Sequence, residues 1–110
     1  MTRKQERIEL NQSIIINDVI NGGIFGEVVN VTTEGLMVMA DINIPKHAVY
    51  QLSLQLPTSI LGSDSIELGV EFLWCKVEEN CERHWAGAKI IDASEQAISQ
   101  LVQLIEDYKK

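Results

Sequence analysis

The stretch IFGEVVNVTTEGLMVMA, residues 24–40, decides the fold. It consists of two apolar runs, 24–31 and 36–40, separated by the polar residues Thr32, Thr33 and Glu34 and by Gly35. Short apolar runs that alternate with turn signals are typical of an all-β protein. We therefore predict two strands at 24–31 and 36–40, joined by a turn at 32–35.

The same alternation continues on both sides of this stretch. Asn21-Gly22-Gly23 is a strong turn signal, and Leu52, Leu54 and Leu56 alternate with polar residues as in a half-buried strand. Further strands are predicted at 14–20, 49–56, 66–77 and 81–91, with a connector at 42–46, a loop at 57–65 and a turn at 78–80. Six strands favour a closed antiparallel β-barrel, because closure removes exposed edges.

The last segment changes to a helical period. Its apolar residues at helical spacing are Ala97, Ile98, Leu101, Val102, Ile105 and Tyr108. Asp92 followed by Glu95 resembles a capping box with Asp92 as N-cap. This pattern predicts an amphipathic helix at 93–109 that packs on the barrel through Ile98, Leu101, Val102 and Ile105, with a partner or dimer contact as the other interpretation.

Composition limits what the protein binds. The chain has 110 residues, 45% of them hydrophobic, and a net charge of −7, so we expect one domain without affinity for DNA, RNA or anionic lipid. No apolar run is long enough to span a bilayer and no signal peptide is visible, which predicts a cytoplasmic protein. We expect it to be a monomer or weak dimer. We predict a flexible arm at 1–12 and the barrel with its helix at 13–110.

The arm holds the first candidate for chemistry. Arg3 and Arg7 are two of only three arginines in this acidic chain, and Lys4 lies between them. Arginine presents a planar fork that matches phosphate or a guanine edge, so this pair suggests an anion site. The other interpretation is a solvated basic tail.

Metal and enzyme chemistry find less support. Cys75, Cys81 and His84 have a spacing that structural zinc sites seldom use, so free thiols and no metal are expected. No nucleophile motif, phosphate-binding loop or dinucleotide fingerprint is present, and we predict no enzymatic activity and no cofactor.

Taken together, the motifs resemble those of the PilZ domain family. That family has Arg-x-x-x-Arg before its first strand and Asp/Asn-x-Ser-x-x-Gly between the second and third. This chain has Arg3-x-x-x-Arg7 and Asn30-x-Thr32-x-x-Gly35 in the same order. The stretches 70–74, ending in Trp74, and 85–90, containing Gly87, resemble the family's fifth and sixth strands.

The resemblance implies a six-stranded β-barrel with a C-terminal helix that binds cyclic di-GMP, a bacterial second messenger, and relays its binding in trans to a protein partner in motility, biofilm or related signalling. It implies ligand contacts from Arg3, Arg7, Asn30, Thr32 and Gly35, with Lys4, Trp74 and Gly87 as further candidates. Threonine replaces the family's serine at position 32. The alternative is a PilZ-fold adaptor that binds protein but no nucleotide.

Overall fold

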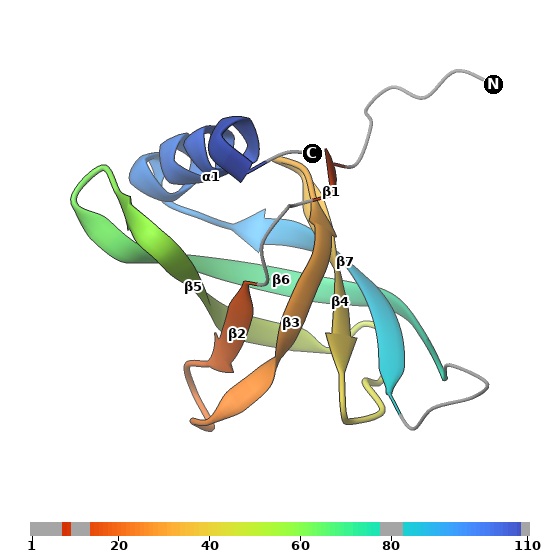
Figure 1. Cartoon of the computed structure of the whole chain (residues 1–110). Helices are drawn as coiled ribbons and strands as arrows, with labels where there is room; N and C mark the ends of the chain where they lie inside the picture. The colour runs from red at the N-terminus through yellow and green to blue at the C-terminus, as the bar shows by residue number, and fades with distance from the viewer. Residues whose placement is uncertain (1–7, 10–13, 78–82, 109–110) are drawn as a thin grey trace, which may run out of the picture.

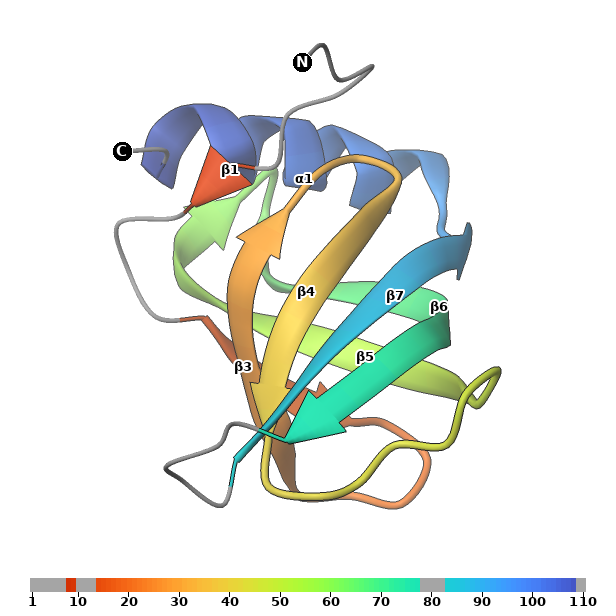
Figure 2. The same cartoon turned by 90° about the vertical axis from the view of Figure 1, so that its right-hand side faces the viewer.

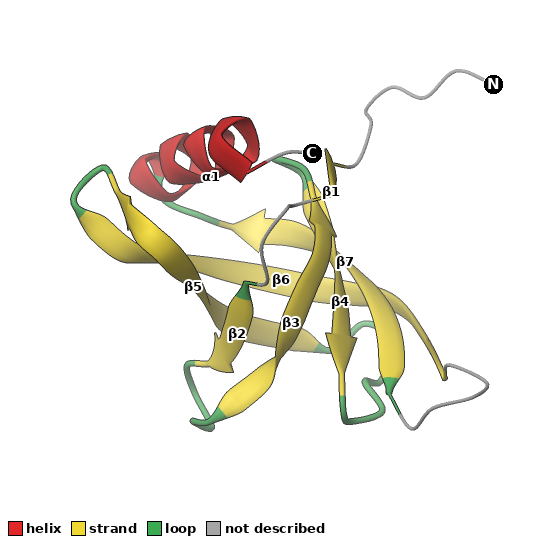
Figure 3. Ribbon diagram, in the orientation of Figure 1, coloured by secondary structure: helices red, strands yellow, loops and turns green. Residues whose placement is uncertain are grey.

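Eight elements make up the structure, a computed structural model that describes residues 8–9, 14–77 and 83–108. The described residues form seven strands and one helix. Figure 1 labels them, and Figure 3 distinguishes them by colour. In chain order they are β1 (Ile8–Glu9), β2 (Ile15–Asp18), β3 (Ile24–Val31), β4 (Gly35–Ala40), β5 (Val49–Ile60), β6 (Ser63–Val77), β7 (His84–Asp92) and α1 (Glu95–Tyr108).

Six of the strands close into an antiparallel barrel, as the sequence predicts. The strand order is β3-β2-β5-β6-β7-β4, and β4 returns to pair with β3 (Figure 2). The two residues of β1 continue this sheet beyond Ile15, the first residue of β2, with Ile8 opposite Val31 and Glu9 opposite Asn30. The beginning of the described chain therefore lies beside the last residues of β3.

The barrel interior is filled by alternate side chains of each strand. In β4, Leu36, Val38 and Ala40 are buried, whereas Met37 and Met39 are only partly buried. This period-2 pattern is the one expected for a strand with one face in the core. The aromatic rings of Phe25, Tyr50 and Phe72 pack against one another with centroids 4.9 to 5.7 Å apart.

The helix packs against β5 and β6 at one end of the barrel (Figure 1). It begins at Glu95, and the Oγ of Ser94 accepts a hydrogen bond from the N–H of Ala97 at 3.0 Å. The prediction of Asp92 as N-cap is therefore wrong, because Asp92 is the last residue of β7. Within the described residues, no helix is long and apolar enough to cross a membrane.

The buried face of α1 also differs from the predicted one. Ala97, Leu101 and Leu104 are buried, whereas Val102 is 49% exposed. The polar Gln100 is buried among the apolar residues, with 4% of its surface exposed. A buried amide needs hydrogen-bond partners, and these come from the adjoining hairpin.

That hairpin replaces the predicted loop at 57–65. Strand β5 continues to Ile60 and β6 begins at Ser63, joined by Leu61 and Gly62 with φ angles of 52° and 82°. The Nε2 of Gln100 donates to the carbonyl oxygen of Ile60 at 3.0 Å and to that of Ser65 at 3.3 Å. The loop prediction is wrong because this stabilising contact comes from a residue distant in sequence.

The predicted strand 14–20 ends earlier, at Asp18, for a local reason. One carboxylate oxygen of Asp18 accepts hydrogen bonds from the N–H groups of Ile20 and Asn21, both at 3.1 Å, and the other accepts from the Asn21 side chain at 3.0 Å. Gly22 and Gly23 follow with φ of 81°. The side chain of Asp18 therefore turns the backbone before the apolar run is finished.

The Gln100 contact predicts a stability effect. Gln100→Ala removes the side-chain donor to the carbonyl of Ile60 in a buried contact, whereas the carbonyl of Ser65 keeps the hydroxyl of Ser63 as a donor at 2.9 Å. We expect the free energy of unfolding to fall by about 1–3 kcal/mol. Denaturant unfolding followed by circular dichroism measures it. Gln103→Ala is the matched control, because Gln103 bonds only to Asp107 on the exposed surface and its loss should cost less than about 0.5 kcal/mol. Equal losses in both variants would contradict this role of Gln100.

The turn at Asp18 predicts a pH dependence. Burial acts to raise the pKa of Asp18, but the hydrogen bonds from Asn21 and Ile20 outweigh it and hold the pKa below its ordinary value of 3.8. Between the lowered pKa of the folded protein and the ordinary pKa of the unfolded chain, the unfolded chain binds more protons. The free energy of unfolding therefore rises with pH in this range and falls as the pH is lowered. Unfolding free energies across the acid range should therefore rise more with pH in the natural protein than in Asp18→Asn. Parallel pH profiles would exclude a contribution from the Asp18 charge.

Candidate functional site

The turn between β3 and β4 is held by the hydroxyl of Thr32. Its Oγ1 accepts hydrogen bonds from the N–H groups of Glu34 at 3.0 Å and Gly35 at 3.1 Å, and lies 3.4 Å from the carbonyl oxygen of Gly35. The backbone N–H of Thr32 also donates to the Gly35 carbonyl at 2.8 Å. A hydroxyl offers one donor and two acceptor positions, so all of them are used within the turn.

Gly35 is required by the close approach of β4 to β7. A Cβ at Gly35 would stand 2.5 Å from the carbonyl oxygen of Ala88, which is too close for any side chain. The N–H of Ile90 donates to the carbonyl of Glu34 at 2.8 Å and fixes the turn to β7. The turn is therefore pinned to the strand beside it.

Next to this turn, one residue from each of the strands β3, β4, β7 and β6 lies in a row across the sheet. The pairs are Asn30 opposite Met37, Met37 opposite Gly87, and Gly87 opposite Trp74. Residues directly opposite one another in an antiparallel sheet share a face. The alternate positions of these strands are in the core, so this set lies on the outside of the barrel. We call Asn30, Met37, Gly87 and Trp74 the outer-face row.

Trp74 and Gly87 of this row fit together. A Cβ on Gly87 would overlap the indole of Trp74, so the ring lies across the backbone of β7. Trp74 reaches this position because the register of β6 against β7 shifts between Phe72 and Trp74. Gly87 thus provides the space in which the half-buried indole packs flat on the sheet.

A charged group adjoins the outer-face row on the side nearer the turn. Lys89 lies opposite Gly35 on one side and Glu71 on the other. The Nζ of Lys89 is 3.7 Å from one oxygen of Glu71, and the Nδ1 of His47 is 2.9 Å from the other. The hydrogen bond with His47, assisted by the charge of Lys89, holds the pKa of Glu71 below its ordinary value. Sequence reasoning missed Lys89, because only the strand register places it beside Gly35.

One atom of the outer-face row has no hydrogen-bond partner in the part of the chain that the structure describes. The Oδ1 of Asn30 is buried, and no described residue donates a hydrogen bond to it. Buried acceptors are nearly always satisfied in folded proteins, so this oxygen marks a place for a donor. It lies in the strand position that faces Glu9 of β1.

Strand register places five of the eight residues expected at the site near one another, on β3, β4, β6 and β7 and in the turn between β3 and β4: Asn30, Thr32, Gly35, Trp74 and Gly87. The other three, Arg3, Lys4 and Arg7, lie outside the described residues. Cys81 also lies outside them. The Sγ of Cys75 accepts a long hydrogen bond from the N–H of Ile44 at 3.5 Å, and the described residues contain no group of three His, Cys, Asp or Glu side chains placed to hold a metal.

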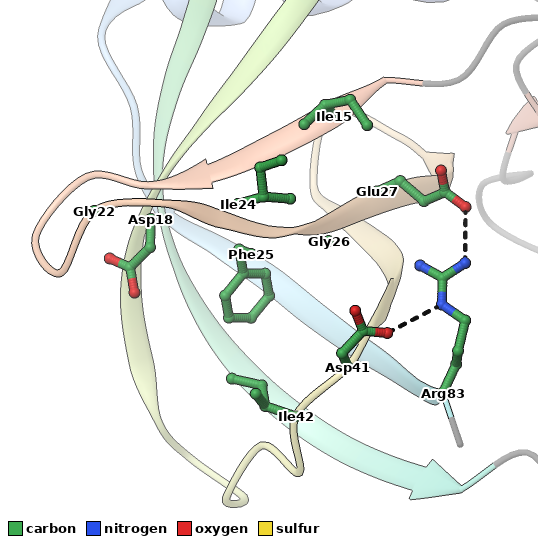
Figure 4. A pocket seen from close by; sticks show the side chains of 10 residues that line it. All are labelled: Ile15, Asp18, Gly22, Ile24, Phe25, Gly26, Glu27, Asp41, Ile42 and Arg83. Carbon is green, nitrogen blue, oxygen red and sulfur yellow. Dashed lines mark hydrogen bonds and ion pairs between the residues drawn. The ribbon is translucent and has the colours of Figure 1, made fainter. Parts of the chain in front are cut away.

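A separate groove opens near the β2–β3 turn, with a volume of about 450 Å³ (Figure 4). At one end of it Arg83 makes ion pairs with Glu27 at 3.3 Å and Asp41 at 3.4 Å. None of the five described residues expected at the site lines this groove. Its lining is mixed apolar and acidic, formed by Ile15, Asp18, Gly22, Ile24, Phe25, Gly26, Glu27, Asp41, Ile42 and Arg83.

Comparison with solved structures identifies the architecture. The inhibitor of motility MotI/DgrA from Bacillus subtilis superimposes with a TM-score of 0.75 at 12% identity, over 96% of this chain and 51% of that one. MrkH from K. pneumoniae gives 0.76 at 11% identity, over 97% and 50%. This chain therefore spans about half the length of these two proteins.

The match to a PilZ domain itself covers both chains. The PilZ domain of YcgR from Escherichia coli, solved with c-di-GMP, gives a TM-score of 0.67 at 10% identity, over 97% of this chain and 91% of that one. No protein-family profile and no curated protein sequence matches the chain. A six-stranded closed barrel followed by one helix is the PilZ fold, and this chain has it. The predicted fold is confirmed.

The role of Thr32 in the turn is testable by two substitutions. Thr32→Val keeps the shape of the side chain but leaves the N–H groups of Glu34 and Gly35 without their acceptor. We expect it to lower the unfolding free energy by about 1–2 kcal/mol. Thr32→Ser keeps the hydroxyl and should cost less, at most about 0.8 kcal/mol for the loss of one buried methyl group. Thermal and urea unfolding measure both. A valine variant as stable as the serine variant would show that the hydroxyl does not hold the turn.

Proposed function

We propose that this protein is a non-enzymatic receptor for cyclic di-GMP, which binds on the outside of the barrel over the outer-face row. The observation that carries the proposal is the register of β1. It sets Ile8 and Glu9 beside the end of β3, with Glu9 opposite Asn30, whose buried Oδ1 has no donor among the described residues. Because Arg7 is bonded to Ile8, this register supports the proposal that the arginine motif reaches the Asn30 motif.

The direction of β1 supports the approach of the arginines. It runs antiparallel to β3, with Glu9 opposite Asn30 and Ile8 opposite Val31. Arg7 precedes Ile8 in the chain, and consecutive Cα atoms are about 3.8 Å apart, so Arg7 is close enough in sequence to reach this edge. One further step of the same register would set Arg7 opposite Thr32, at the turn, and Arg3 is only four residues away.

The chemistry of the ligand matches these groups. Cyclic di-GMP has two phosphodiester charges and two guanines, and an arginine fork can bond to either a phosphate or a guanine edge. Lys4 adds positive charge. The amide of Asn30 offers a donor and an acceptor to a base edge, and the flat indole of Trp74 offers a surface on which a purine stacks. Thr32 and Gly35 act through the turn that positions Asn30.

Two structural neighbours are consistent with this ligand. The YcgR domain was solved with c-di-GMP, and so was PlzA from Borreliella burgdorferi, which matches with a TM-score of 0.56 at 10% identity. We further propose that binding is relayed to a protein partner in trans. Ordering of an arm on the ligand changes the surface that such a partner meets.

Titration calorimetry with cyclic di-GMP tests the proposal. We expect saturable binding to the natural protein, weaker by about ten- to a hundredfold in Arg7→Ala, because a charge-assisted hydrogen bond is worth about 1.5–3 kcal/mol. An Arg3→Ala/Arg7→Ala double variant should show no heat of binding. Arg83→Ala is the matched control, since Arg83 pairs with Glu27 and Asp41 in the groove of Figure 4.

Circular dichroism verifies that each variant is folded. If the folded natural protein gives no heat at high micromolar ligand, the receptor proposal is wrong and the adaptor alternative stands. Equal weakening by Arg7→Ala and Arg83→Ala would show that the arm makes no specific contact.

A further inference from the structure

Lys89 lies where a ligand on the outer-face row extends toward the turn. It follows Gly87 by two residues on β7, so both residues face the same side of the sheet, about 7 Å apart along the strand. It is also directly opposite Gly35. A dinucleotide ligand that covers Gly87 and reaches Gly35 therefore passes the ammonium group of Lys89.

The ion pair between Lys89 and Glu71 is weak. The Nζ of Lys89 and the nearest oxygen of Glu71 are 3.7 Å apart, and 55% of the lysine side chain is exposed. Exposed pairs of this kind contribute little stability. A phosphodiester that binds here can therefore replace Glu71 as the partner of Lys89 at a small cost in free energy.

Glu71, in contrast, has a second and closer partner. The Nδ1 of His47 lies 2.9 Å from its other oxygen. The N–H of His47 donates to the carbonyl of Phe72 at 2.7 Å, which fixes this histidine, at φ 69°, beside β6. Glu71 therefore keeps a hydrogen bond when Lys89 leaves. Its carboxylate also repels a phosphate that approaches from the outer-face row.

We propose that Lys89 binds a phosphate group of the ligand and that Glu71 competes with the ligand for Lys89, which lowers the affinity of the site. This inference rests on the proposed function and adds to it a further ligand-binding residue and a residue that sets the affinity. Lysine acts here as a point charge, so its contribution is sensitive to salt, whereas the arginine forks also supply geometry.

Calorimetry with cyclic di-GMP on four proteins tests this inference: the natural chain, Lys89→Gln, Glu71→Gln and the double variant. We expect Lys89→Gln to weaken binding by about tenfold and to make affinity less dependent on salt. Glu71→Gln should tighten binding by about two- to fivefold. In the double variant the gain from Glu71→Gln should shrink, because there is no lysine left to release.

Lys76→Gln is the control for loss of a lysine charge. Lys76 is exposed on the same strand as Glu71, lies opposite Trp85, and is five residues further from the turn. Its loss should leave affinity within about twofold. If the natural protein binds cyclic di-GMP and Lys89→Gln binds equally well, the role of Lys89 is refuted while the receptor function stands. If the folded natural protein does not bind, the receptor function itself fails.

Discussion

The structure depends on the pairing of β4 with β7. Six consecutive residue pairs join these strands, from Gly35 with Lys89 to Ala40 with His84, and β4 also pairs with β3. This pairing closes the barrel and leaves neither β4 nor β7 with an unpaired edge. It also requires glycine at position 35, because Ala88 approaches the backbone there too closely for a side chain. Core and candidate site are both consequences of the same register.

Because side chains alternate between the two faces of a strand, the same strands supply both the core and the candidate site. Leu36, Val38 and Ala86 face the interior, while Met37 and Gly87 between them face outward. A shift by one residue would exchange the two faces and bury the wrong set. The strand register therefore fixes the positions of the outer-face row as it fixes those of the core. All four residues of the row lie on strands.

Local patterns made much of the fold predictable, and longer-range contacts account for the errors. The turns at Gly22-Gly23 and at 32–35 are encoded by the residues within them, and the strands between them alternate regularly. The hairpin from 57 to 65 was misjudged because Gln100, 40 residues from Ile60 in sequence, supports it. The N-cap was misassigned because strand β7 continues through Asp92. Asn30, Thr32 and Gly35 were proposed from their resemblance to a family motif, whereas Lys89 could be proposed only from the strand register.

The way in which Gln100 attaches the helix has a consequence for how this end of the molecule can vary. Its amide recognises main-chain oxygens of Ile60 and Ser65, atoms that every amino acid possesses. The contact therefore depends on the path of the hairpin backbone and not on which side chains the hairpin carries. Exposed positions such as Leu61 are left open to substitution wherever the left-handed backbone is tolerated. Relatives of this chain can therefore present different surfaces beside the helix without loosening its attachment.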